Sequence, residues 1–200
     1  MGPEPQETRS SARGGIGTAL IALGANVPRP GRTLRETLEA ALSDLAAGGA
    51  PVRAVSRFYR TPCFPAGAGP DYVNAAAVLE WDGPPRGLLD LLHAVERAHG
   101  RERVRRWGRR TLDLDLLALG DAVLPDRATF EAWRALPPVA QSEEAPGELI
   151  LPHPRMHERA FVLVPLAEVA PGWVHPVLGA DVAQLCRALP DDLRGEVVPL

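Results

Sequence analysis

The segment "TLDLDLLAL", residues 111 to 119, has the pattern of a buried β-strand and yet carries two aspartates. Because successive side chains of a strand point to opposite faces, Asp113 and Asp115 share one face, and the leucines at 112, 114 and 116 share the other. Adjacent carboxylates repel one another, and a bridging divalent cation relieves the repulsion; oxygen ligands favour Mg²⁺ or Mn²⁺ over zinc. The alternative is a solvated strand face, or two structural salt bridges to nearby arginines.

Apolar runs and helical spacings on both sides of this segment predict the remaining elements. Strands are expected at 18–26, 52–61, 71–81 and 111–119, and helices at 32–48 and from Pro84 or Pro85 to Gly100. The order β-α-β-β-α-β is typical of a ferredoxin-like α+β fold, with an antiparallel sheet and helices on one of its faces.

The chain has 200 residues, 46% of them hydrophobic, which is enough for one well-filled core. We expect a disordered tail over 1–16, which is rich in Pro, Glu, Ser and Gly, and a single domain over 17–200. Residues 121–148 show no strand periodicity and are expected to be an insertion. The apolar pattern returns at 148–173, and 180–190 predicts a last short helix, so the core has C-terminal additions.

Composition excludes several classes of function. The net charge of −3 disfavours a general nucleic-acid or membrane-surface binder, and no apolar run approaches the ~18 residues of a membrane span. Residues 1–15 are polar and have no apolar stretch, so we do not expect them to be a secretory signal, and Cys63 and Cys186 form no disulfide framework or zinc motif. The absence of lysine excludes a Walker-type phosphate loop. We therefore expect a soluble cytoplasmic enzyme or binding protein, with no nucleic acid, no membrane and no obligate protein partner evident.

Arginines precede the acidic strand in an unusual density. Residues 101–110, "RERVRRWGRR", contain six arginines around Trp107. Mg²⁺ completes its coordination shell with substrate phosphates, and arginines clamp phosphate oxygens, so the combination favours phosphoryl or nucleotidyl transfer. An RNA-binding loop in which Trp107 stacks on a base is the alternative, but it has no use for the adjacent carboxylates.

His153 and His157 are four residues apart, a spacing that can bind a metal on a helix. No glutamate of the zincin type follows His153, and prolines flank it on both sides. A phosphate hydrogen-bond donor or a surface residue is the favoured interpretation for both histidines.

Five blocks of the sequence together resemble one family. They are "RRWGRRTLDLDLLALG" (105–120), "LPHPRMHERAFVLVPL" (151–166), "SRFYRTPCF" (56–64), "PDYVNAA" (70–76) and "IALGAN" (21–26). In content and order they resemble the 6-hydroxymethyl-7,8-dihydropterin pyrophosphokinases of folate biosynthesis. The resemblance spans roughly residues 18–120 and 148–190.

This resemblance implies transfer of an intact pyrophosphate from ATP to the 6-hydroxymethyl oxygen of the dihydropterin, with release of AMP. It implies two Mg²⁺ ions, held by Asp113 and Asp115, with ATP as co-substrate. Arg110 would stabilise the transferring group, with Arg101 as its partner.

The resemblance also assigns both substrate sites. The pterin is expected at Thr61, Pro62, Phe64, Tyr72, Asn74, Trp107 and Phe161, with its ring stacked between Tyr72 and Phe161. ATP is expected at His93, Arg103, Arg110, Leu116, Ile150, His153 and Arg159, and His93 stands where the family often has glutamine. Three features depart from the family pattern: Arg109 replaces a proline, the 103–107 loop is one residue shorter, and the 120–148 segment is longer.

Three other functions fit parts of the pattern. A polymerase- or cyclase-like palm also pairs two aspartates on a ferredoxin-like sheet, but it does not require the aromatic and amide residues of the pterin motifs. An RNA-recognition module uses a similar scaffold but stacks bases on aromatics that "VNAAAVLEW" does not offer at its centre. A relative that binds ATP without catalysis is disfavoured by the intact set Arg101, Arg110, Asp113 and Asp115.

Overall fold

The structure, a computed structural model, describes residues 17–63, 69–100, 110–137 and 146–200. The predicted tail over 1–16 lies outside the described residues. So do four of the predicted site residues, which are Phe64, Arg101, Arg103 and Trp107.

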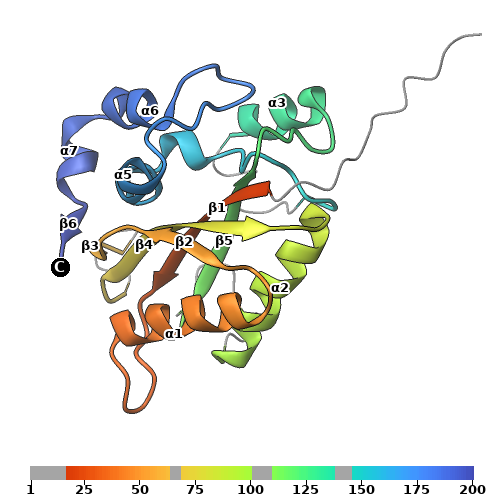
Figure 1. Cartoon of the computed structure of the whole chain (residues 1–200). Coiled ribbons are helices and arrows are strands. Elements are labelled where there is room, and N and C mark those ends of the chain that lie inside the picture. The colour runs from red at the N-terminus through yellow and green to blue at the C-terminus, as the bar shows by residue number, and fades with distance from the viewer. Residues whose placement is uncertain (1–16, 64–68, 101–109, 138–145) are drawn as a thin grey trace, which may run out of the picture.

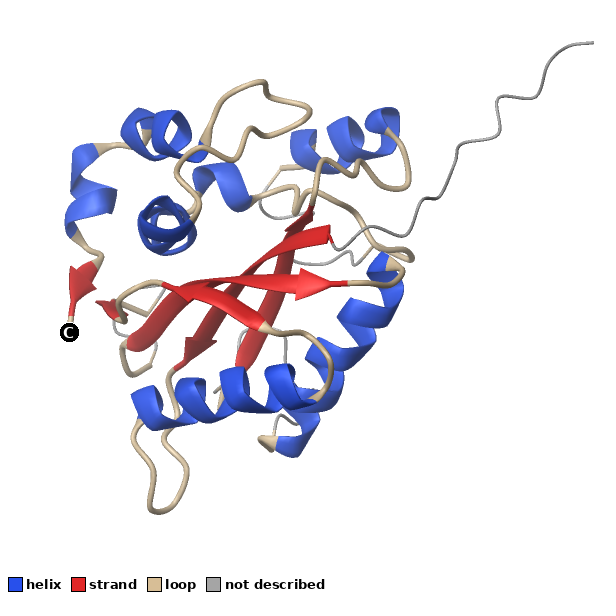
Figure 2. Cartoon of the chain, in the orientation of Figure 1, coloured by secondary structure: helices blue, strands red, loops and turns tan. Residues whose placement is uncertain are grey.

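The described residues form one antiparallel sheet. Its strands are β1 (Gly17–Ala25), β2 (Val52–Val55), β3 (Tyr59–Thr61), β4 (Tyr72–Trp81), β5 (Asp113–Leu119) and β6 (Val198–Pro199). Their spatial order is β5-β1-β4-β3-β6, and β2 pairs with the far half of β4. Strand β1 therefore lies between the acidic strand β5 and the long strand β4, as Figure 2 shows.

Helices cover both faces of this sheet (Figure 1). They are α1 (Leu34–Ala47), α2 (Pro85–Ala98), α3 (Arg127–Ala135), α5 (Ala160–Val169), α6 (Val182–Ala188) and α7 (Asp191–Gly195), with a short 3₁₀ turn, η1 (Met156–Glu158). Helices α1 and α2 lie on one face, as the ferredoxin-like prediction requires, and that prediction is confirmed. The C-terminal additions supply α5, which packs against β4 on the opposite face.

Local sequence explains where helix α1 begins. The Thr33 hydroxyl accepts the N–H of Glu36 at 3.2 Å, and the Glu36 carboxylate accepts the N–H of Thr33 at 2.7 Å. This capping box satisfies backbone donors that the first turn leaves without a partner. The helix then buries Leu38, Leu42 and Leu45 against the sheet.

The predicted strand over 52–61 is wrong in one respect, because it is two strands, β2 and β3. The hydroxyl of Ser56 accepts the N–H of Ala76 at 3.0 Å and donates to the carbonyl of Arg57 at 2.7 Å. A side chain thus takes a β4 donor that a continuing strand would have used, and the backbone ladder is interrupted.

The segment over 121–148 contains helix α3, which the sequence analysis did not predict. Asp126 begins the helix by accepting the N–H of Thr129 at 2.9 Å. Phe130 is fully buried in a small cluster with Ile150 and Val177. At least this part of the predicted insertion is therefore packed against the C-terminal segment.

A β-bulge in β5 divides its apolar residues between the two faces. Ile21 of β1 pairs with Leu116, but the preceding residue Leu20 pairs with Ala118, so Leu117 is an extra residue. Leu116 is buried on the α1 and α2 side, whereas Leu117 and Ala118 are buried on the α5 side. Before the bulge, the alternation predicted from sequence holds, with the aspartates opposite the leucines.

Candidate active site

The two aspartates of β5 and an asparagine of β4 share one face of the sheet, on either side of β1. In the β-sheet register, Gly24 pairs with Asn74 on one side and with Asp113 on the other. Two residues further along these strands, Ala22 pairs with Asp115. Since neighbouring strands lie about 4.8 Å apart, the backbones of Asn74 and Asp113 are separated by about 10 Å. Two small residues thus form a floor between an amide and a carboxylate pair.

Gly24 is required by close approach. A Cβ at this position would lie 2.6 Å from the amide oxygen of Asn74 and 4.0 Å from the ring of Tyr72. The first distance is far below van der Waals contact, so a side chain here would displace Asn74. Gly24 lies in the block "IALGAN", but the sequence pattern alone gave no reason for a glycine at this position.

The amide of Asn74 is held in place by a neighbouring strand. Its Nδ2 donates to the hydroxyl of Thr61 at 2.7 Å, and both side chains are buried. Strand pairing places Thr61 opposite Tyr72, so the predicted pterin residues of β3 and β4 come together. Pro62 follows directly after β3 and is exposed.

Arg110 lies at the carboxylates, just before β5 begins. Its guanidinium makes an ion pair with Asp113. Burial acts to lower the pKa of Arg110, but the charges of Asp113 and Asp115 outweigh it, and the net pKa is raised. The guanidinium therefore stays charged beside the carboxylate pair, which is where an anionic group would need it.

His153 reaches the same site along the open edge of β5. The backbone N–H of His153 donates to the carbonyl of Leu117 at 2.8 Å, and the ring Nδ1 accepts the backbone N–H of Arg155 at 3.1 Å. The proton of the neutral ring is therefore assigned to Nε2. Burial, with the positive charge of Arg159, lowers the pKa of His153 to about 3. This histidine is thus a neutral hydrogen-bond donor at physiological pH.

Arg159 and Phe161 are presented by the N-terminus of α5. Arg159 is the N-cap residue, and its guanidinium lies 5.7 Å from the ring centroid of Phe161. Burial lowers the pKa of Arg159, an effect opposed by the nearby charges of Asp115 and Asp113. Phe161 is 37% exposed, which is unusual for a large apolar side chain. Part of its ring surface is therefore open to solvent.

Three of the predicted ATP residues are buried or half-buried. The side chains of Leu116 and Ile150 are buried, the first against α1 and α2 and the second beside Phe130. Neither side chain is therefore exposed to a substrate. His93 is a half-buried residue of α2, the helix that packs along β5.

Two further residues support the site without having been predicted. Asn26 holds the backbone of Arg110 at the end of β1, because its Oδ1 accepts the N–H of Arg110 at 2.8 Å. Glu96 of α2 is 1% exposed and accepts the N–H of Leu114 at 2.8 Å, which satisfies a donor on the open edge of β5. The sequence held a sign of this role, because Glu96 is a charged residue next to Val95 on the apolar side of an amphipathic helix.

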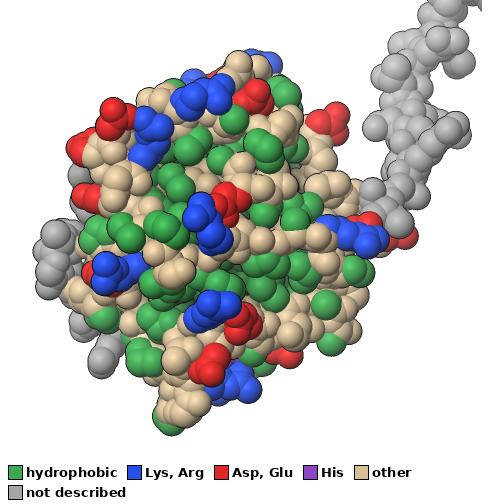
Figure 3. Space-filling view, turned by 60° about the vertical axis from the view of Figure 1, so that its left-hand side comes forward, with side chains coloured by type: hydrophobic (Ala, Val, Ile, Leu, Met, Phe, Trp, Pro, Cys, Tyr) green, Lys and Arg blue, Asp and Glu red, His purple; other side chains and the backbone are tan. Residues whose placement is uncertain are grey.

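Charges of both signs alternate on one face of the molecule. On the face in Figure 3, basic and acidic side chains lie beside each other instead of forming a patch of one sign. Among the described residues, no helix is long and apolar enough to cross a membrane, and no group of three or more His, Cys, Asp or Glu residues is placed to hold a metal. A metal held by only two carboxylates, with substrate phosphates as its other ligands, would not require such a group of three.

Comparison with known families assigns the chain. The family model of 7,8-dihydro-6-hydroxymethylpterin-pyrophosphokinase (HPPK) matches residues 20–171. The chain belongs to this family, and the predicted resemblance is confirmed.

Characterised relatives align over most of their length. The 2-amino-4-hydroxy-6-hydroxymethyldihydropteridine pyrophosphokinase of Synechocystis is 39% identical over 168 residues, which cover 84% of this chain and 73% of the relative. The Haemophilus influenzae enzyme of the same name is 39% identical over 159 residues, covering 80% and 85%. The Pseudomonas aeruginosa enzyme is 36% identical over 176 residues, covering 88% and 93%.

Solved structures support the fold. The wild-type HPPK-DHPS of Plasmodium falciparum superposes with a TM-score of 0.60 at 15% identity and covers 88% of this chain. This chain spans 42% of that longer protein, so the likeness concerns one part of it.

Proposed function

We propose that this protein transfers pyrophosphate from ATP to the 6-hydroxymethyl group of 6-hydroxymethyl-7,8-dihydropterin and releases AMP, as a step of folate biosynthesis. The observation that carries the proposal is the meeting of a carboxylate pair and a buried amide across Gly24 on one sheet face. The names of the relatives support it. We also propose that residues 17–200 act as one domain in the cytoplasm, with ATP, Mg²⁺ and the pterin as sufficient partners.

Asp113 and Asp115 are the residues that would hold magnesium, and we propose two ions. Their oxygens suit a hard cation, and Mg²⁺ commonly binds one or two carboxylates together with substrate phosphates. When bound, the ions would neutralise phosphate charge and hold the triphosphate in line for displacement.

The phosphate end of the site is built from groups that donate hydrogen bonds. Arg110 and Arg159 supply charge near the aspartates, and His153 supplies a neutral Nε2–H. In the reaction the hydroxymethyl oxygen attacks the β-phosphorus, and the bond to the oxygen between the α- and β-phosphorus breaks. Donors that are already oriented stabilise the charge on the transferring group without reorganisation. We propose the same role for Arg101, with Arg103 closing on ATP.

The pterin end is proposed to be flat and to carry one amide. Tyr72 and Phe161 offer ring faces for stacking, and the amide of Asn74 can both donate and accept at the rim of a pterin. The hydrogen bond from Asn74 to Thr61 fixes the orientation of that amide. Pro62, Phe64 and Trp107 are proposed to complete this pocket, and backbone atoms of Leu116 and Ile150, with His93, to contact ATP.

The test is an assay of AMP release with Mg-ATP, with and without the dihydropterin. We expect pterin-dependent AMP without ADP, and a loss of at least about 100-fold in Asp113→Ala and Asp115→Asn, as is typical when charge stabilisation is removed. Asp121→Asn changes an exposed carboxylate just after β5 and is the matched control. Hydrolysis of ATP that does not depend on the pterin, or normal turnover in Asp115→Asn, would overturn the proposal.

A further inference from the structure

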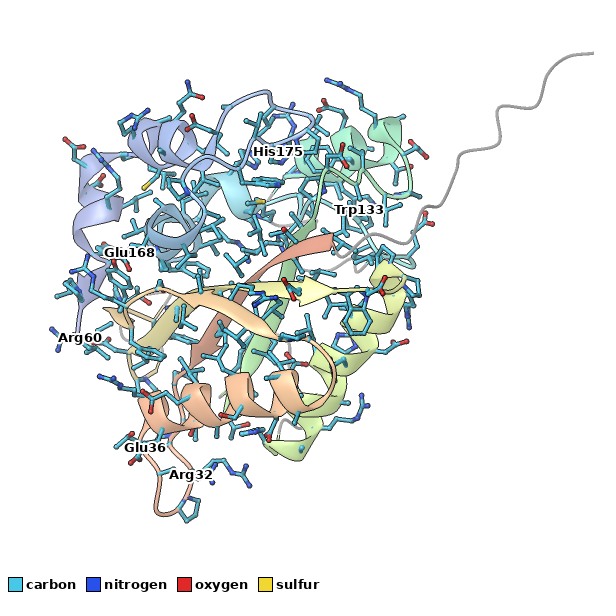
Figure 4. All side chains as sticks on the ribbon, viewed as in Figure 1. Arg32, Glu36, Arg60, Trp133, Glu168 and His175 are labelled. Carbon is cyan, nitrogen blue, oxygen red and sulfur yellow. The ribbon has the colours of Figure 1, made fainter. Side chains whose placement is uncertain are left out.

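A carboxylate near the C-terminal end of α5 connects two walls of the candidate pterin pocket. Glu168 follows Phe161 by seven residues, so two helical turns place both side chains on the same side of α5. Figure 4 shows Glu168 on the side of α5 that faces β3. The helix that presents Phe161 is therefore attached at its far end through Glu168.

Glu168 binds two residues around the start of β3. Its Oε1 accepts the hydroxyl of Tyr59 at 2.6 Å and the Nε of Arg57 at 2.7 Å, and its Oε2 accepts the backbone N–H of Arg57 at 2.8 Å. The guanidinium of Arg57 also donates to the Tyr59 hydroxyl at 3.2 Å. Three donors, two from Arg57 and one from Tyr59, thus bind one carboxylate of α5.

The buried member of this group is Tyr59. It is 2% exposed, and burial, with the hydrogen bond to Glu168, raises its pKa to about 12. Burial acts to raise the pKa of Glu168, but the hydrogen bonds from Tyr59 and Arg57 lower it overall. Because the side chain of Arg57 is 65% exposed, its ion pair is screened by water, and the Tyr59 hydroxyl makes the stronger connection.

Tyr59 belongs to the opposite wall of the pocket. It pairs directly with Asn74 across β3 and β4, and Thr61, two residues later, binds the Asn74 amide. The hydrogen bond from Tyr59 to Glu168 therefore joins the strand pair that holds Asn74 to the helix that holds Phe161.

The N-terminal end of α5 has separate attachments on the ATP side. The backbone N–H of His153 donates to the carbonyl of Leu117 at 2.8 Å, and the backbone N–H of Arg159 donates to the carbonyl of Met156 at 3.4 Å. The N–H of Met156 in turn donates to the carbonyl of His153 at 3.1 Å, so these backbone bonds connect Arg159 to β5 through Met156 and His153, without Glu168. Release of Glu168 would leave them in place and remove the polar connection between β3 and the opposite end of the helix, where apolar packing remains.

We propose that Glu168, through Tyr59, is a positioning residue for pterin binding. It touches neither substrate; it fixes the separation between the stacking ring of Phe161 and the amide of Asn74. The inference rests on the proposed function and adds to it a division of the scaffold, in which Glu168 governs the pterin and leaves ATP unaffected.

The test is a comparison of the two substrates in three variants. In Tyr59→Phe, which lacks only the hydroxyl, we expect the KM for the dihydropterin to rise about three- to ten-fold, while the KM for ATP and kcat change less than about two-fold. Glu168→Leu is expected to show a larger rise of the same kind. Glu168→Gln keeps one acceptor oxygen for Tyr59 but places an NH2 group against a donor of Arg57, so its KM for the dihydropterin is expected to lie between those of the wild type and Glu168→Leu.

The control is Glu80→Leu, which breaks a comparable ion pair with Arg53 between β2 and β4, away from the pocket. It should alter neither KM. Equal rises in both KM values, no rise in Tyr59→Phe, or a Glu168→Gln enzyme as impaired as Glu168→Leu would overturn the inference. If Glu168→Leu does not fold, Tyr59→Phe decides. A wild-type enzyme that ignores the pterin contradicts the proposed function itself, whereas normal variants contradict only the positioning role.

Discussion

Asn26 and Arg110 hold each other by a reciprocal pair of hydrogen bonds where β1 ends and β5 is about to begin. The side-chain oxygen of Asn26 accepts the N–H of Arg110 at 2.8 Å, and the carbonyl of Arg110 accepts the N–H of Asn26 at 3.0 Å. The backbone of Arg110 is thereby fixed from both sides. With the backbone fixed, only the side-chain torsions of Arg110 determine whether its guanidinium contacts Asp113.

Asn26→Ala removes one half of this pair and leaves the N–H of Arg110 without its side-chain acceptor. We expect kcat to fall about ten-fold, because a loss near 1.4 kcal/mol in orientation of the charged group appears in the transition state. Steady-state AMP release measures the effect. An unchanged kcat would show that the guanidinium of Arg110 is oriented by Asp113 alone.

Gly24→Ala places a methyl group 2.6 Å from the amide oxygen of Asn74. We expect the KM for the dihydropterin to rise at least about ten-fold, because overpacking of 1–3 kcal/mol displaces the amide. Gly17→Ala in the same strand is the control, since its Cβ would meet the flexible side chain of Leu119 at 3.3 Å. If both variants behave alike, a close approach at Gly24 is not what limits the pocket.

Glu96→Ala leaves the buried N–H of Leu114 without the carboxylate that accepts it at 2.8 Å. The free energy of unfolding should fall by about 1–3 kcal/mol, the usual cost of a buried donor that loses its partner. Urea unfolding measures this, and Glu96→Gln, which keeps an acceptor, should lose less. The exposed Glu39→Ala is expected to change stability by less than about 0.5 kcal/mol.

His175 makes stability depend on pH. The ring is fully buried near α3 (Figure 4), and its Nδ1 accepts the N–H groups of Val177 and Leu178 at 3.2 and 3.3 Å. Burial, with the nearby His157, lowers the pKa of His175 to about 4. Below an unfolded pKa of about 6.5 the unfolded chain binds a proton that the folded chain refuses. Stability is therefore full above pH 6.5 and falls as the pH drops towards 4.

The expected loss from this one residue is about 3 kcal/mol between pH 7.5 and pH 4. His175→Asn keeps an acceptor for the same N–H groups but does not titrate, so its unfolding free energy should fall less over that interval. His153 is present in both proteins and its contribution cancels. Parallel pH profiles for the two proteins, measured by urea unfolding, would contradict the assignment.

Much of the fold could be predicted from local pattern. The predicted strand at 18–26 and helix at 32–48 match β1 and α1 to within a few residues, and the shared face of Asp113 and Asp115 followed from strand alternation alone. The break at Ser56 could not be predicted, because it depends on a hydrogen bond to Ala76, twenty residues away.

The site was predictable in its chemistry more than in its geometry. Residue types identified the carboxylate pair and the amide, but the role of Gly24 depends on its distance from Asn74 on a neighbouring strand. The family resemblance assigned Leu116 and Ile150 to the ATP site, but it could not show that their side chains are buried. Glu168 gave no signal at all, since only the packing of α5 brings it to Tyr59.

The bulge at Leu117 also determines which changes of length β5 can accept. If the pairing from Leu116 onwards is kept, a residue inserted or deleted between Asp115 and Leu116 would reverse the facing of both aspartates relative to β1, turning leucines towards the substrates and carboxylates into the core. A two-residue change would keep the facing but move the aspartates along the strand. We therefore expect β5 to accept apolar substitutions of similar volume at its buried leucines, but not a single-residue insertion or deletion before the bulge.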